Sequence, residues 1–179
     1  MPHPFFTIGH STRPIEEFVA LLQQANVRVL ADVRTIPRSR TNPQFNSEAL
    51  RLTLAERQIQ YHHIKKLGGL RGKRPGGEDS PNTFWRNESF RNYADYAWST
   101  EFSEGLQELL DLDRIGVCAI MCAEAVWWRC HRRIIADYLT AMGRTVVHIV
   151  SASDMTPAAL TAAARLLRDG KVIYDQPLT

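Results

Sequence analysis

Residues 117–133 read VCAIMCAEAVWWRCHRR, and this stretch decides the fold. Its first five residues are continuously apolar, as a strand buried on both faces tends to be. A buried strand followed by an amphipathic helix is the repeating unit of α/β proteins with a parallel sheet. The polar residues between the two lie where ligands bind in open α/β sheets. The apolar stripe that indicates the helix consists of Ile134, Ile135, Tyr138, Leu139 and Met142.

The same alternation of strand and helix patterns extends over the whole chain. We therefore predict a three-layer α/β fold, with a mainly parallel sheet that carries helices on both faces, in a single domain over residues 1–179. No internal repeat is visible. Strands are expected at residues 5–8, 27–33, 59–64, 117–121, 145–150 and 171–174, and helices at 15–25, from 47 to about 58, at 93–110 (one or two), 134–142 and 157–167.

The segment 65–89 differs from the rest of the chain because it is rich in glycine, proline and charge. Loops of this length inside compact domains are usually functional lids or locally disordered segments. We expect a long loop here and leave both interpretations open.

Composition and charge exclude some classes of protein. Hydrophobic residues make up 44% and charged residues 23%, and no apolar run approaches the roughly 18 residues of a membrane span. Neither a membrane segment nor a secretory signal is visible, so we expect a cytoplasmic protein. Three cysteines, all between positions 118 and 130, do not resemble a disulfide framework.

The net charge of +3 is too small to indicate nucleic-acid binding, but the basic residues are grouped. Such groups suit anionic substrates or phosphate backbones, and they also occur as ordinary solvated surface. The three groups are Arg34, Arg38 and Arg40; Lys65, Lys66, Arg71, Lys73 and Arg74; and Arg129, Arg132 and Arg133.

Several short motifs in this chain occur together in one known family. The chain resembles the domain-of-unknown-function family 488, in the order of the motifs and over nearly its full length. The resemblance implies more about the fold and the position of the site than about the reaction. The motifs are Thr7-Ile8-Gly9-His10-Ser11, Asp32-Val33-Arg34 with Pro37-Arg38-Ser39, Phe45-Asn46, Leu67-Gly68-Gly69, Cys122-Ala123-Glu124 and Cys130-His131-Arg132.

The thiol of Cys122 follows the buried strand and is the candidate nucleophile. Nearby helix amides and arginines would lower its pKa and favour the thiolate, whereas the alternative is a buried structural cysteine. Cys118 shares its face of the strand and is expected to be structural. A redox pair with Cys130 stays open, because spacing alone does not fix the separation that a disulfide needs. A cysteine-phosphatase loop is not supported, since position 128 is tryptophan and the glycine-rich turn is absent.

Three further residues of this stretch carry candidate chemistry. Glu124 is a candidate general acid or base, or it pairs with an arginine or caps the helix. His131 is a candidate proton carrier, expected to be neutral because a helix N-terminus disfavours its charged form, with packing as the alternative. Arg132 and Cys130 are predicted substrate contacts, and a surface ion pair is the alternative for Arg132.

The ends of the first two strands should deliver polar groups to the same crevice. Gly9, His10 and Ser11 end the first strand, with His10 a candidate catalytic residue and the others substrate contacts. Asp32 and Arg34 end the second strand and either bind substrate or pair with each other. Arg38 is a further predicted anion contact. Trp127 and Trp128 are expected to pack, although either could stack on a base.

Metal binding has only weak support. His10, Cys122, Glu124, Cys130 and His131 include ligand types for zinc or iron, but they lack the paired short spacings of a zinc knuckle, so no metal residue is assigned.

We therefore expect a hydrolase or transferase that binds a small anionic, phosphorylated or nucleotide-like substrate in a Cys/Glu/His/Arg crevice. Two alternatives remain: a nucleic-acid-binding module without catalysis and a metal-binding protein. Cofactor and oligomeric state are left unassigned.

Overall fold

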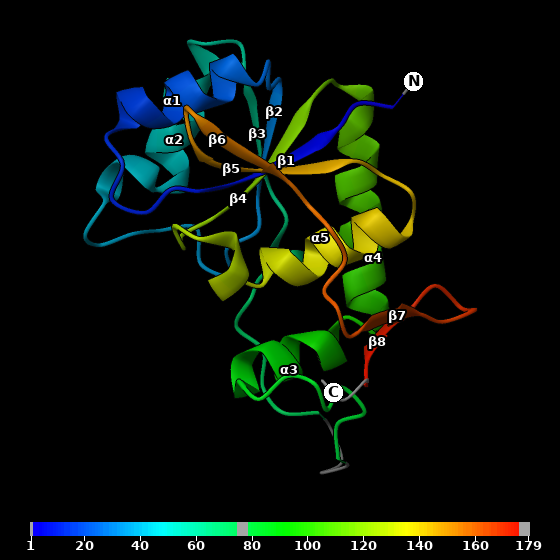
Figure 1. The fold of residues 1–179 in the computed structure, drawn as a ribbon. Coiled ribbons are helices and arrows are strands. Elements are labelled where there is room, and N and C mark those ends of the chain that lie inside the picture. Colours follow the sequence, from blue (N-terminus) through cyan, green and yellow to red (C-terminus); the bar gives the residue numbers. More distant parts are fainter. Residues whose placement is uncertain (1, 75–78, 176–179) are drawn as a thin grey trace.

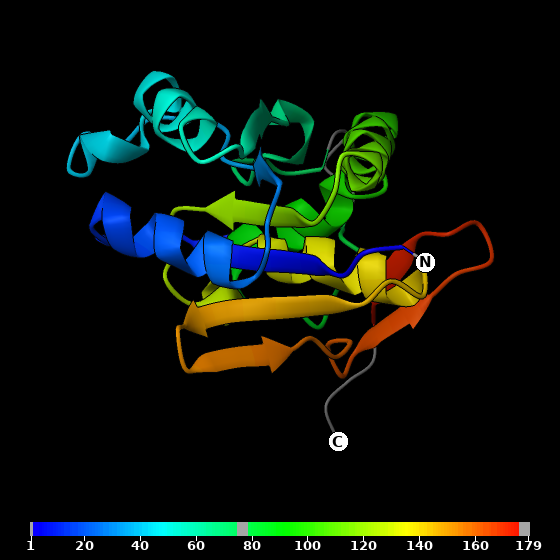
Figure 2. The same cartoon turned by 90° about the horizontal axis from the view of Figure 1, so that it is seen from above.

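A computed structural model describes residues 2–74 and 79–175. Its centre is a six-stranded sheet with the order β3-β2-β4-β1-β5-β6. The first five strands run parallel, and β6 pairs antiparallel with β5; Figure 2 shows these two arrows pointing in opposite directions. The strands are β1 (Phe5–Gly9), β2 (Val29–Asp32), β3 (Gln60–His63), β4 (Cys118–Cys122), β5 (Val146–Ser151) and β6 (Asp154–Pro157).

Helices cover both faces of the sheet, which confirms the predicted three-layer α/β fold (Figure 1). The predicted helical region over residues 93–110 consists of two helices, α3 and α4. Among the described residues, each α-helix begins or ends within a few residues of a predicted boundary. The additional helix predicted at residues 157–167 does not form, as described below. The α-helices are α1 (Ile15–Gln24), α2 (Ser47–Ala55), α3 (Glu88–Tyr96), α4 (Thr100–Asp111) and α5 (Arg132–Ala141).

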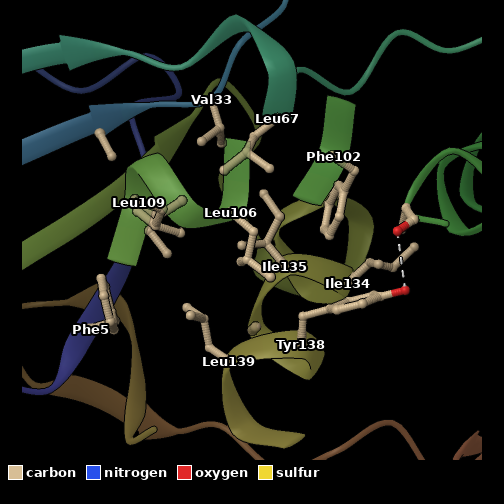
Figure 3. Packing of buried hydrophobic residues seen from close by; sticks show 14 of the residues in the cluster. Phe5, Val33, Leu67, Phe102, Leu106, Leu109, Ile134, Ile135, Tyr138 and Leu139 are labelled. Carbon is tan, nitrogen blue, oxygen red and sulfur yellow. Dashed lines mark hydrogen bonds between the residues drawn. The ribbon is translucent and has the colours of Figure 1, made fainter. Parts of the chain in front are cut away.

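Alternation along the strands divides the core into two clusters. On one face Ile8, Leu30 and Met121 pack beneath α1 and α2. On the other face Phe5 and Val33 pack against α4 and α5 (Figure 3). Successive side chains of a strand point to opposite faces, so a continuously apolar strand supplies both clusters at once. The remaining labelled members of the second cluster are Leu67, Phe102, Leu106, Leu109, Ile134, Ile135, Tyr138 and Leu139.

The prediction of a helix at residues 157–167 is wrong. The chain forms β6 up to Pro157 and then β7 (Ala164–Leu166), which pairs antiparallel with β8 (Val172–Tyr174) in a separate two-stranded sheet. The expected strand at 171–174 thus exists, although it lies outside the main sheet. Tertiary contacts override the helix propensity of the alanines here. The Thr161 backbone N–H donates to the buried carboxylate of Asp137 at 2.9 Å and fixes the segment in an irregular conformation against α5.

The long segment after β3 is partly ordered by secondary structure. Lys65–Leu67 forms a short 3₁₀ helix, and α3 already begins at Glu88. Residues 75–78 of the predicted loop lie outside the described residues. Among the described residues, no helix is both long and apolar enough to cross a bilayer.

Candidate functional site

A cleft of about 460 Å³ lies beyond the carboxyl ends of β2 and β4, at the start of α5. The register of the sheet creates it: Gly9 of β1 pairs with Cys122 of β4, and Asp32 of β2 pairs with the neighbouring Met121. The ends of β1, β2 and β4 therefore meet at one edge, as the sequence predicts. The cleft is lined by Arg34, Thr35, Ile36, Arg38, Gly69, Leu70, Asn87, Ser89, Phe90, Cys122, Ala123, Glu124, Arg129, Cys130 and His131.

A thiol and an imidazole meet in this cleft. The Sγ atom of Cys130 lies 3.5 Å from Nδ1 of His131, and Nε2 of the same ring lies 2.8 Å from the carbonyl oxygen of Val33. A carbonyl oxygen only accepts, so Nε2 carries the proton and Nδ1 presents its lone pair to the thiol. Burial lowers the pKa of His131 and so favours the neutral ring near pH 7, whereas the sequence-based prediction attributed neutrality to the helix N-terminus. The pair has the arrangement of an activated thiol: nucleophile, base, and a third group that orients the base.

Gly69 makes room for this imidazole. A Cβ atom at position 69 would lie 2.5 Å from Nδ1 of His131. Only glycine therefore allows the ring to occupy its place between the Val33 carbonyl and the Cys130 thiol. This explains a specific requirement for the second glycine of the Gly68-Gly69 motif.

The two cleft cysteines differ in how easily they ionise. Burial raises the pKa of the Cys122 thiol well above its usual value, and the neighbouring Cys130 raises it further. For Cys130, burial opposes ionisation, but interactions with Cys122 and with Arg132 outweigh it and lower the pKa. The expectation of a lowered pKa at Cys122 is therefore wrong. Its Sγ faces a carbonyl, that of Glu124, at 3.8 Å, whereas Cys130 Sγ accepts from the backbone N–H of Arg132 at 3.5 Å.

Arg132 is buried beneath the cleft and is absent from its lining. Its guanidinium donates to the carbonyl oxygens of Glu124 (2.8 Å) and Ala125 (3.4 Å) and to the hydroxyl of Thr7 (3.3 Å). Within residues 2–74 and 79–175 no carboxylate pairs with it, and its Nε is buried without a partner. A permanently charged guanidinium needs a counter-ion when it is buried. Interaction with Arg132 is one of the causes that lower the pKa of the Cys130 thiol, so the buried guanidinium favours the ionised form of that thiol.

Arg34 reaches the cleft from the opposite side, held by a buried ion pair. Its Nε and Nη2 donate to the two carboxylate oxygens of Asp32 at 2.9 and 2.7 Å, and Nη2 also donates to the carbonyl of Phe45 at 2.7 Å. Tyr61 donates its hydroxyl to the same carboxylate. Asp32 is fully buried and absent from the cleft lining. Of the two predicted roles for Asp32 and Arg34, the structure shows mutual pairing, with Arg34 also facing the cleft.

The motif at the end of β1 supports the cleft from behind. His10 is buried, stacks on Phe45 with ring centroids 4.4 Å apart, and its Nε2 lies 3.4 Å from Nη1 of Arg34. The Ser11 backbone N–H donates to the carbonyl of Ala123 at 3.0 Å. A Cβ atom at Gly9 would lie 1.7 Å from the Glu124 carbonyl oxygen. None of the three predicted residues lines the cleft; they fix the backbone and the arginine that do.

The mouth of the cleft combines charge with apolar surface. Arg38, Arg129 and Glu124 are exposed there, so two cations flank one carboxylate. The sequence reasoning missed the rim residues Ile36 and Leu70, which are 62% and 72% exposed. Exposed apolar side chains beside a polar floor are typical of ligand sites. Phe90, Asn87 and Ser89 of the α3 region were also missed, and no motif in the sequence marks them.

The second basic group is largely engaged within the protein. Lys66 forms an ion pair with Glu104 at 2.6 Å, Lys73 lies 3.7 Å from the Glu88 carboxylate, and the Arg71 guanidinium stacks 3.7 Å from the ring centroid of Tyr96. These contacts leave fewer cations of this group to track a phosphate backbone.

The two tryptophans differ in their surroundings. Trp127 stacks on the buried ring of His148 with centroids 4.4 Å apart, in a packing role as predicted, while Trp128 is half-exposed.

Metal ligands do not gather in the part of the chain that the structure describes. No three His, Cys, Asp or Glu side chains there are arranged to hold an ion. The five ligand-type residues that the sequence offers are divided: His10 lies behind Arg34, and the other four line the cleft.

A model of one known protein family matches most of the chain. The model of the family "Domain of unknown function DUF488" matches residues 14–139. The chain belongs to this family. The matched region of this DUF488 protein includes Arg34, Gly69, Cys122, Cys130 and His131, and thus the centre of the cleft. Neither a curated protein nor a solved structure matches the chain.

Proposed function

We propose that this DUF488 protein is a cysteine-dependent hydrolase or transferase that acts on a small anionic substrate in the cleft. The observation that carries the proposal is the contact of Cys130 Sγ with Nδ1 of His131 at 3.5 Å, in a ring whose Nε2 is fixed by the Val33 carbonyl. The contacts favour Cys130 over Cys122 as nucleophile, because Cys130 has the imidazole, an amide donor and a lowered pKa.

The residues suit a two-step group transfer. Cys130 Sγ would attack an electrophilic carbon or phosphorus, while His131 takes the thiol proton and later gives it to the leaving group. Water or a second substrate would then attack the thioester or thiophosphate and release Cys130. Cys122, next to Cys130, would keep its proton and stabilise the thiolate by hydrogen bonding.

The anion preference rests on the charges around the thiol. Arg34 is pre-oriented by Asp32, and Arg38 and Arg129 stand at the mouth, against the single carboxylate of Glu124. A pre-oriented guanidinium binds phosphate or carboxylate with little loss of side-chain entropy. The apolar rim at Ile36 and Leu70 fits a substrate that joins an anionic group to an apolar or aromatic part, as a nucleotide or an aryl phosphate does.

Protection of the thiol tests binding without knowledge of the natural substrate. The alkylation rate of Cys130 by iodoacetamide is measured by mass spectrometry at pH 7 in the presence of nucleoside phosphates, aryl phosphates or anionic acyl esters. We expect at least one class to slow alkylation tenfold or more, and Arg34→Met to abolish the protection. Cys118, buried in β4 and absent from the cleft lining, provides the unreactive internal control.

Turnover of the protecting class tests catalysis. Cys130→Ser and His131→Gln should lose product formation while circular dichroism shows an intact fold, and Cys118→Ala should keep it. Retained turnover in Cys130→Ser, or the absence of protection by every anion class, would overturn the proposal. If instead single-stranded nucleic acid bound with an affinity that falls steeply with salt, the nucleic-acid-binding alternative would replace it.

A further inference from the structure

We propose that Cys122 and Cys130 form a reversible redox pair, in which a hydroperoxide oxidises Cys130 and Cys122 then closes a disulfide with it. This is a modification site at the floor of the cleft. Its chemistry needs only the two thiols and access from the cleft, and it does not depend on any hydrolase or transferase activity.

The two thiols come from different elements and meet in one place. Cys122 ends β4 and Cys130 lies two residues before the start of α5. Seven residues separate the two cysteines, yet both line the cleft and their side chains interact. The third cysteine, Cys118, lies on the same face of β4 but is buried away from the cleft. The fold therefore presents two of the three thiols to a ligand that enters the cleft.

Backbone hydrogen bonds hold both cysteines in place, and the first residues of the segment that connects them are exposed to solvent. The Cys122 carbonyl accepts from the His10 N–H at 2.9 Å, and the Cys130 carbonyl accepts from the Arg133 N–H at 3.0 Å. Residues 123–125 between them are exposed. Because Ser11 holds the Ala123 carbonyl and Arg132 holds the carbonyls of Glu124 and Ala125, the proposed disulfide closes by rotation of the two cysteine side chains rather than by movement of this connection.

The surroundings of Cys130 and Cys122 indicate which thiol reacts first and which one then closes the disulfide. Cys130 has the contact with His131, the amide of Arg132 and the buried guanidinium charge, so it is the thiol that ionises and reacts first. Cys122 keeps its proton and stands next to the sulfur that would be oxidised. A reactive thiol with a neighbouring resolving thiol is the arrangement that forms disulfides through a sulfenic acid.

The reaction balances with one hydroperoxide. The Cys130 thiolate attacks the terminal oxygen and the O–O bond breaks; the alkoxide leaves and takes up a proton as an alcohol, and Cys130 becomes a sulfenic acid. The Cys122 sulfur then attacks the Cys130 sulfur, the S–O bond breaks, and water leaves with the Cys122 proton. Two electrons pass from the dithiol to the peroxide, and an external dithiol restores the reduced pair.

Disulfide formation would also regulate the proposed activity, a consequence that rests on the proposed function. The disulfide removes the thiolate from His131 and eliminates the nucleophile.

Peptide mapping of the whole protein tests the pair directly. The reduced protein is treated with equimolar hydrogen peroxide, remaining thiols are alkylated, and trypsin cleaves after Arg129, which places Cys122 and Cys130 on separate peptides. We expect a cross-linked peptide pair, lighter than the sum of its parts by two hydrogens, that dithiothreitol separates. Cys118 shares the tryptic peptide of Cys122, so Cys118→Ser is the matched control and should give the same cross-link.

The variants distinguish the mechanism from random oxidation. Cys122→Ser should lower the cross-link at least tenfold and leave Cys130 as a sulfenic or sulfinic acid, and Cys130→Ser should leave Cys122 reduced. Wild-type protein that oxidises further at Cys130 without a cross-link, or that loses all three thiols at equal rates, would overturn the redox pair. A cross-link in a protein that turns over no anionic substrate would leave the redox pair intact and refute only the proposed function.

Discussion

Replacement of Asp32 by asparagine should be among the most destabilising single changes in the polar part of this protein. The carboxylate is fully buried and accepts from Arg34 at 2.9 and 2.7 Å, and from the hydroxyl of Tyr61. Asparagine keeps the volume but removes the charge, and its NH₂ group opposes a guanidinium N–H, donor to donor. Arg34, 6% exposed, then becomes a buried cation without a counter-ion.

Removal of one partner of a buried ion pair costs about 3–5 kcal/mol. That is a large fraction of the roughly 5–15 kcal/mol that stabilises a typical domain, so the unfolding midpoint should fall by about 10 °C. Urea unfolding followed by circular dichroism measures the free energy of unfolding. Arg34→Met should also destabilise, and the double variant should lose less than the sum of the two single losses, because each removes the same interaction.

A surface ion pair supplies the control. Arg13 lies just before α1, 3.0 Å from Glu17 in the first turn of that helix. The Glu17 side chain is 54% exposed, so Glu17→Gln should cost about 0.5 kcal/mol or less. If Asp32→Asn cost no more than Glu17→Gln, or if the double-variant cycle showed additive losses, then the buried pair would not be what holds Arg34 at the cleft.

Three further outcomes are expected. Gly69→Ala should displace His131 and slow alkylation of Cys130 at pH 7 by about tenfold, since a shift of 1 Å in a reacting group can lower a reaction rate up to about a hundredfold. Gly72→Ala is the control: a Cβ atom at Gly72 meets nothing within 4 Å, so Cys130 of this variant should react at the wild-type rate. Burial lowers the pKa of His148 to about 4. The unfolded state therefore binds the proton more tightly than the folded state, and about 3 kcal/mol of stability should be lost as the pH falls from 6.5 to 4. His148→Gln should remove that part of the pH dependence. Identical profiles of stability against pH for the variant and the wild type would contradict the assignment. The alkylation rate of Cys130 should rise with a midpoint below pH 9, the usual thiol value, and a midpoint above it would show that Arg132 and His131 do not favour the thiolate.

The fold was predictable where local and long-range preferences agree. The apolar run before Cys122 and the helical stripe after it required a buried parallel strand and a covering helix, and the structure has both. At residues 157–167 they conflict. The alanine-rich composition favours a helix, but Pro157 pairs with Val147 and Thr161 is bound to Asp137 of α5, and such contacts between distant residues leave no trace in local composition.

The sequence predicted the location of the candidate site better than the roles of its residues. Parallel strands bring their carboxyl ends to one edge, so Arg34 and Cys122 could be expected in the same cleft. The sequence could not predict which of the two cleft thiols has the lower pKa. That difference depends on which sulfur faces a backbone amide and which faces a carbonyl. His10 shows the same limit: its position after β1 indicates the cleft, but its ring turns back onto Phe45.

The electrostatics of the cleft floor link the proposals. The sheet edge holds two buried arginines, and only Arg34 has a carboxylate partner within residues 2–74 and 79–175. Arg132 is held by carbonyl oxygens and a hydroxyl, which orient its charge without neutralising it. An acidic residue beside Arg132 would stabilise the fold more, but it would compete with the Cys130 thiolate and raise the pKa of that thiol. The uncompensated charge is therefore a stability cost that favours ionisation of the Cys130 thiol, and both the proposed group transfer and the proposed reaction with peroxide require an ionised sulfur.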